Sequence, residues 1–167
     1  MGMVASIHQV TTFQLKRIIQ SPELVDKWIF PEDDADQEEM LVDDGLYFGR
    51  SLFGLNFFMT GYIEGGEPPI SYAIFGKHLL FENDWGMHSC NYLMPNEVEE
   101  VWSALREITK HDLLSQFDVD VMNEIPIYPS ATWEDSDFDY LYDLFEKMTA
   151  YYEDAVHNGN AMIHLVY

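Results

Sequence analysis

The chain has 167 residues, and its 30 acidic side chains outnumber its 8 lysines and arginines, which gives a formal net charge of −22 at pH 7. This length corresponds to one domain, and 47% hydrophobic residues suffice to form a core. The charge disfavours nucleic acid and anionic membranes as partners because both are negative.

The sequence predicts a cytoplasmic protein. Residues 1–6 lack a basic segment followed by an apolar one, so they do not resemble a secretory signal. No apolar stretch approaches the roughly 20 residues that a membrane-spanning helix needs. One cysteine excludes an internal disulfide and suits a reducing compartment.

The first elements that the sequence predicts are a strand and two short helices. Residues 3–10 form an apolar run typical of a strand. Thr11 and Thr12 offer an N-cap for a helix that follows directly. Pro22 then marks the start of a second short helix.

An acidic segment and two apolar runs come next. Residues 32–44 hold eight carboxylates and no lysine or arginine, which predicts an exposed acidic loop. Residues 46–59 fit a buried helix or two strands, and periodicity does not decide between them. Residues 70–75 fit a buried strand or the start of a helix that stops at Gly76.

The clearest predicted helices lie in the second half of the chain. Residues 96–108 carry one apolar stripe, and Asn96 with Glu99 matches a capping box. Residues 136–157 predict a longer amphipathic helix that ends at Gly159.

The last predicted element is a strand over residues 161–167, which are β-branched and aromatic. Long helices combined with a few separated strands indicate the α+β class. We expect a single domain over residues 1–167, with a small mixed sheet packed by helices.

No motif in the sequence names an enzyme class, a metal or a cofactor. An EF-hand that starts at Asp34 fails at its sixth position, where Glu39 replaces the required glycine. Phosphate-loop, dinucleotide-binding and nucleophile-elbow patterns are absent. The sequence therefore predicts neither a metal site nor a cofactor, and it leans away from an enzyme.

One group of residues is a candidate ligand pocket near residues 76–90. A histidine after a buried element often lines a cleft, and a histidine beside a cysteine could activate the thiol. The candidate ligand-binding residues are His78, Trp85, His88, Cys90 and Tyr128.

The acidic character predicts a different kind of site. Residues 111–146 contain ten acidic side chains and no lysine or arginine. Together with the acidic loop they would attract a basic protein by long-range electrostatics. The candidate partner-binding residues within the loop are Asp33, Asp34, Asp36, Glu38 and Glu39.

Several short motifs resemble a known family in chain order. They are residues 58–61, 70–76 and 117–129, the pair Tyr92-Leu93 and Trp133. The motifs resemble the YfbM-like bacterial proteins, known as domain of unknown function 1877.

The resemblance implies a single α/β sandwich-like domain of bacterial origin and supplies no catalytic residues. The family usually has a tryptophan and a histidine in the helix before its Thr-Gly pair. Leu52 and Asn56 stand at those positions here, so a role of that pair in relatives does not carry over.

The sequence leaves three hypotheses open. The first is a non-enzymatic protein-binding or inhibitory module for a basic partner. The alternative is a small-ligand binder or hydrolase-like enzyme with a pocket near residues 76–90. A third is mimicry of nucleic acid by the acidic faces.

Overall fold

The structure is a computed structural model that describes residues 3–29, 43–81, 89–125, 127–128 and 132–167. The strands are β1 (Ala5–Val10), β2 (Leu46–Gly49), β3 (His78–Phe81), β4 (Ser89–Leu93) and β5 (Ala161–Val166). The helices are α1 (Thr12–Gln20), α2 (Leu24–Ile29), α3 (Leu52–Thr60), α4 (Tyr72–Phe75), α5 (Pro95–Leu105), α6 (Lys110–Gln116), α7 (Val119–Glu124) and α8 (Asp137–Asn158).

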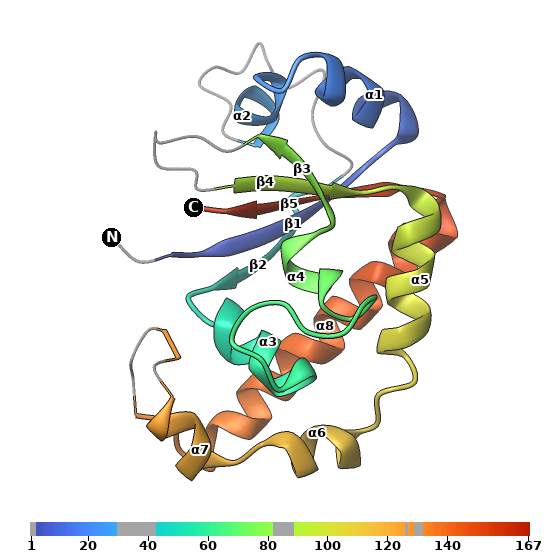
Figure 1. Ribbon diagram of the computed structural model, residues 1–167. Helices are drawn as coiled ribbons and strands as arrows, with labels where there is room; N and C mark the ends of the chain where they lie inside the picture. Colours follow the sequence, from blue (N-terminus) through green and yellow to red (C-terminus); the bar gives the residue numbers. More distant parts are fainter. Residues whose placement is uncertain (1–2, 30–42, 82–88, 126, 129–131) are drawn as a thin grey trace.

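The strands form one sheet in the order β2-β1-β5-β4-β3. Helices α1 and α2 cover one face, whereas α3, α4, α5 and α8 cover the other, so the sheet is the middle of three layers (Figure 1). The mixed α+β single-domain architecture expected from the sequence is therefore confirmed. The sheet itself is not mixed, because every described pairing is antiparallel. Hydrophobic patterns predict strands but not their direction, so the sequence could not settle this point.

Strand β5 lies at the centre of the sheet, and all six of its residues are buried. It pairs with β1 from Ala5↔Val166 to Val10↔Ala161. Alternate side chains of β5 enter two separate clusters: Met162 joins the large cluster under α3, α5 and α8, and Ile163 joins the smaller one under α1 and α2.

Local signals fix the start of α1 and the end of α8 where the sequence predicted them. The Thr11 hydroxyl accepts the backbone N–H of Gln14, and the Gln14 side chain accepts the N–H of Thr11, which completes a capping box for α1. Helix α8 ends at Gly159, whose φ of +65° is the left-handed conformation that glycine adopts readily.

Of the two alternatives for residues 70–75, the structure confirms the helix, because α4 lies there and ends at Gly76. Two local predictions need correction. Residues 46–59 form a strand followed by a helix, because the positive φ of Gly49 turns the chain between them. Helix α5 begins at Pro95 with Met94 as its N-cap, so the predicted capping box of Asn96 and Glu99 is wrong.

Among the described residues, the structure has no helix with both the length and the hydropathy to cross a bilayer. The predicted acidic loop at residues 32–44 lies mostly outside the described residues. Its last residues are described, and there the Asp43 carboxylate accepts the backbone N–H of Gly45 and the Tyr151 hydroxyl. These contacts attach the end of the acidic segment to α8.

Candidate functional site

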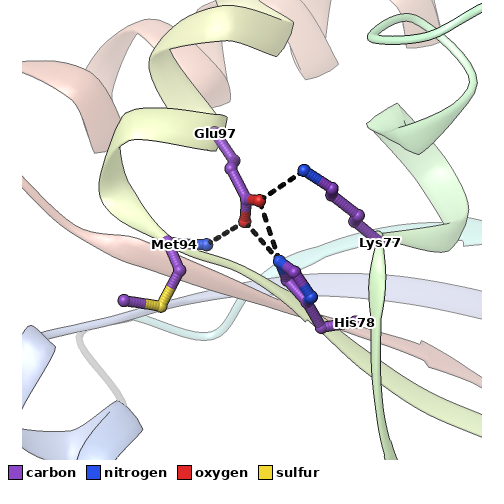
Figure 2. A network of polar contacts seen from close by, with 4 residues as sticks. All are labelled: Lys77, His78, Met94 and Glu97. Atoms are coloured by element: carbon purple, nitrogen blue, oxygen red, sulfur yellow. Dashed lines mark hydrogen bonds and ion pairs between the residues drawn. The ribbon is translucent and has the colours of Figure 1, made fainter.

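His78 lies at the start of strand β3 and belongs to a polar network at the edge of the sheet (Figure 2). Its Nε2 atom is 2.8 and 2.9 Å from the two carboxylate oxygens of Glu97. The Lys77 ammonium donates to the same carboxylate at 2.7 Å. The ring of His78 also stacks on Tyr92, with centroids 5.0 Å apart.

Glu97 connects this network to helix α5. One of its oxygens accepts the backbone N–H of Met94 at 2.9 Å, so the carboxylate caps the helix. Its side chain is 9% exposed, whereas those of Lys77 and His78 are each 38% exposed. Burial would raise the pKa of Glu97, but hydrogen bonds from Lys77, Met94 and His78 outweigh it and lower that pKa.

The network also determines what His78 can do chemically. The hydrogen bond to Glu97 raises the pKa of Lys77, so both members of this ion pair stay charged at neutral pH. A neutral His78 ring that donates from Nε2 keeps a lone pair on Nδ1. His78 could therefore accept a proton at Nδ1, and Glu97 would be its positioning partner.

Cys90 lies on strand β4 and not in a loop. It is fully buried among apolar side chains of the smaller cluster. Burial, and secondarily the charge of Asp26, raise the pKa of this thiol to about 12. The thiol is therefore protonated at neutral pH and unsuited to nucleophilic attack.

Tyr128 belongs to the larger cluster on the opposite face of the sheet. Its ring meets Phe53 edge to face, with centroids 6.3 Å apart. No described contact joins Tyr128 to His78. Trp85 and His88 lie outside the described residues, so a pocket near residues 76–90 stays a prediction.

Two further histidines are buried in the sheet, on opposite faces. His8 of β1 is opposite Ile163, and the next pair is Ile7 with His164 of β5. Each ring makes one hydrogen bond, to the Ser6 hydroxyl for His8 and to the Ile74 carbonyl for His164. Burial lowers the pKa of both rings to about 4, so both are neutral at pH 7. Among the described residues, no group of three or more histidine, cysteine or acidic side chains is arranged to hold a metal ion.

Asn56 is the residue that the sequence resemblance pairs with a histidine of the family. It is fully buried on α3, and its amide nitrogen lies 2.9 Å from the Tyr62 carbonyl and 3.0 Å from the Gly65 carbonyl. This side chain holds the loop that follows α3.

Of the 22 acidic residues that the structure describes, eight exposed ones belong to α6, α7, the start of α8 and the chain between them. These helices lie together at the end of the molecule away from the sheet (Figure 1). We call this region the acidic end. The exposed carboxylates that define it are Asp112, Asp118, Asp120, Glu124, Glu134, Asp135, Asp139 and Asp143. The predicted partner-binding residues Asp33, Asp34, Asp36, Glu38 and Glu39 lie outside the described residues.

Few lysine or arginine side chains lie near the acidic end in the described part of the chain. Those that do already contact other residues. The Lys110 ammonium lies 4.7 Å from the centroid of the Tyr142 ring. Lys147 pairs with Asp143 at 2.7 Å. The field of the remaining carboxylates is therefore directed to solvent.

The sequence singled out His78 but missed its partners Lys77 and Glu97. A usable signal was present, because proline favours the first turn of a helix. Placing Pro95 at the first helical position makes Met94 the N-cap and puts Glu97 where a capping carboxylate belongs.

Comparisons with known proteins agree with the fold and assign no activity. A solved structure described as a protein of unknown function, YfbM from Escherichia coli, superposes with a TM-score of 0.76 over 98% of this chain and 99% of that chain, at 18% sequence identity. No curated protein matches. Residues 1–165 match the family model described as domain of unknown function (DUF1877). The chain therefore belongs to the DUF1877 family.

Proposed function

We propose that this protein is a non-enzymatic binding or inhibitory module that docks a basic partner protein at its acidic end. The observation that carries the proposal is the concentration of exposed carboxylates on α6, α7 and the start of α8. A field of one sign steers an oppositely charged partner and speeds association. The free thiol of Cys90 suits a cytoplasmic setting for this interaction.

Exposed apolar side chains supply the second part of an interface. Leu114 of α6, Val121 of α7 and Tyr140 of α8 are 55%, 40% and 52% exposed. Protein interfaces commonly combine a few large apolar or aromatic side chains with a polar rim. In this proposal the carboxylates bring the partner to the surface, and these side chains hold it.

A fourfold variant tests the proposal without disturbing helix caps. Asp112 and Asp118 accept backbone N–H groups and are left in place. The variant D120N/E124Q/D135N/D139N removes four charges whose carboxylates make no hydrogen bond or ion pair within the described part of the chain. A matched control, E23Q/E64Q/E67Q/E153Q, removes four exposed charges elsewhere.

The experiment is affinity capture from a lysate of the source cells, with each variant immobilised in parallel and washed at low and then high salt. We expect the wild type and the control to retain one basic protein at low salt and to release it at high salt. The acidic-end variant should retain about tenfold less of it. Equal capture by both variants, or retention that ignores salt, would contradict the proposal.

One observation favours a second candidate, a small-ligand or hydrolase-like site at His78. The ring is partly exposed, and Glu97 orients it with Nδ1 available as a base. A thermal-shift screen would compare wild type with His78→Ala, using a set of small esters and phosphates. A ligand that stabilises the wild type alone would support this candidate. No such ligand, or equal stabilisation of both proteins, would count against it.

A further inference from the structure

An open groove of about 860 Å³ separates helix α5 from the chain just before and within α4. One wall is formed by Pro68, Pro69 and Tyr72. The other wall is formed by exposed residues of α5, which include Asn96, Glu99 and Glu100. The groove therefore has an apolar side and an acidic side that face each other.

The Lys77 ammonium lines this groove and lies near the aromatic ring of one wall. The nitrogen lies 5.8 Å from the centroid of the Tyr72 ring and 2.7 Å from a carboxylate oxygen of Glu97. An ammonium is thus held between an aromatic face and an acid of α5. Because Glu97 neutralises the charge of Lys77, the net charge of the groove is determined by its other acidic side chains.

Those other acids are Glu99 and Glu100. Neither forms a hydrogen bond or an ion pair within the described part of the chain, although the charge of Glu100 contributes to the raised pKa of Lys77. Two adjacent carboxylates on an exposed helix repel anions and attract cations. Phosphates and nucleotides are therefore poor candidates for this groove.

We propose that the groove binds a lysine or arginine side chain on an extended segment of a basic partner protein. The aliphatic stem of that side chain would lie along Pro68, Pro69 and Tyr72, and its cationic head would reach Glu99 and Glu100. Charge complementarity selects this occupant over an apolar one. The inference rests on the proposed function, because it gives the basic partner a second contact outside the acidic end.

A peptide titration followed by NMR tests this assignment on the full chain. The probe is the capped peptide Ala-Lys-Ala-Lys-Ala, and the control peptide carries norleucine in place of each lysine. We expect the lysine peptide to shift the backbone amide signals of Tyr72, Asn96 and Glu100. The norleucine peptide, which lacks the charge, should leave them unchanged.

Two variants separate the groove from general attraction by a very acidic protein. E99Q/E100Q should weaken binding of the lysine peptide about fivefold, since it removes the two charges that meet the cation. The matched control E23Q/E153Q removes two exposed charges elsewhere and should change the affinity less than twofold. Equal weakening by both, or shifts spread over the acidic end alone, would overturn the groove assignment.

Spermidine decides whether the occupant is a free polyamine. If spermidine shifts the same groove signals at lower concentration than the peptide, the assignment to a protein segment is wrong. The two proposals also fail separately. Partner capture that depends on the acidic end but not on Glu99 and Glu100 refutes the groove alone, whereas capture indifferent to the acidic end refutes the proposed function.

Discussion

Replacing His164 by asparagine should make the protein less sensitive to acid. The ring is fully buried, and burial lowers its pKa from 6.5 to about 4; the Ile74 carbonyl opposes this effect, and the nearby His8 adds to it. As pH falls below 6.5 the unfolded chain binds a proton at this ring, whereas the folded chain binds none until about pH 4. The stability that the neutral ring contributes above pH 6.5 is therefore lost between pH 6.5 and about 4. For this ring alone the loss is about 2–3 kcal/mol by pH 4.5.

His164→Asn keeps a donor for the Ile74 carbonyl and does not titrate. Its smaller side chain leaves a cavity, so the variant should be about 1–2 kcal/mol less stable than wild type at pH 7.5. Urea unfolding at pH 7.5, 6.5, 5.5 and 4.5 gives the difference between the two proteins. We expect that difference to shrink or reverse by pH 4.5, because only the wild type loses stability when this ring becomes protonated in the unfolded chain.

Apart from His8, whose charge is coupled to that of His164, the other titrating groups affect both proteins equally and cancel in the difference. His157→Asn provides a control at an exposed histidine in the last turn of α8. The same urea series on this variant reports the effect of a histidine-to-asparagine change at a position outside the core. If the free energies of unfolding of wild type and His164→Asn fall in parallel with pH, protonation of His164 does not contribute to the acid sensitivity, and the reasoning is refuted.

Three further variants or reactions follow from contacts in the structure. In Gly54→Ala the new methyl group would collide with the Trp133 ring, so the free energy of unfolding measured with urea should fall by about 1–3 kcal/mol. Glu97→Gln keeps an acceptor for the Met94 N–H but removes the charge that pairs with Lys77, so it should cost about 1 kcal/mol in the same assay, and the exposed Glu107→Gln close to nothing; equal costs would contradict a stabilising role of this charge. Cys90 should react with a thiol reagent orders of magnitude more slowly in folded than in unfolded protein, and rapid labelling of the native state would contradict its burial.

The elements that the sequence predicts correctly are those with strong local signals. Thr11 supplies both a cap and a helix start, and Gly159 ends α8 with a left-handed turn. Strands β3 and β4 were missed because they are short and their pattern does not alternate cleanly. Their conformation depends on pairing beside β5, which is distant in the sequence.

The candidate sites were predictable to different degrees. The charge of residues 111–146 is visible in the sequence, and the structure collects much of it at the acidic end. The partners of His78 were not found, because Glu97 approaches it through the packing of α5 against the sheet. The groove is likewise invisible in sequence, since it brings Pro68 and Glu100 together from separate elements.

The central position of β5 has a consequence for how the protein is made. Residues 5–10 are synthesised before the other elements of the sheet, and all six are buried in the folded protein. Their main hydrogen-bonding partner, residues 161–166, is synthesised after nearly every other element. Until residues 161–166 are made, only β2 can pair with β1, so one edge of this apolar strand stays unpaired for most of the synthesis. This open edge makes β1 a natural binding segment for chaperones that recognise extended apolar peptides.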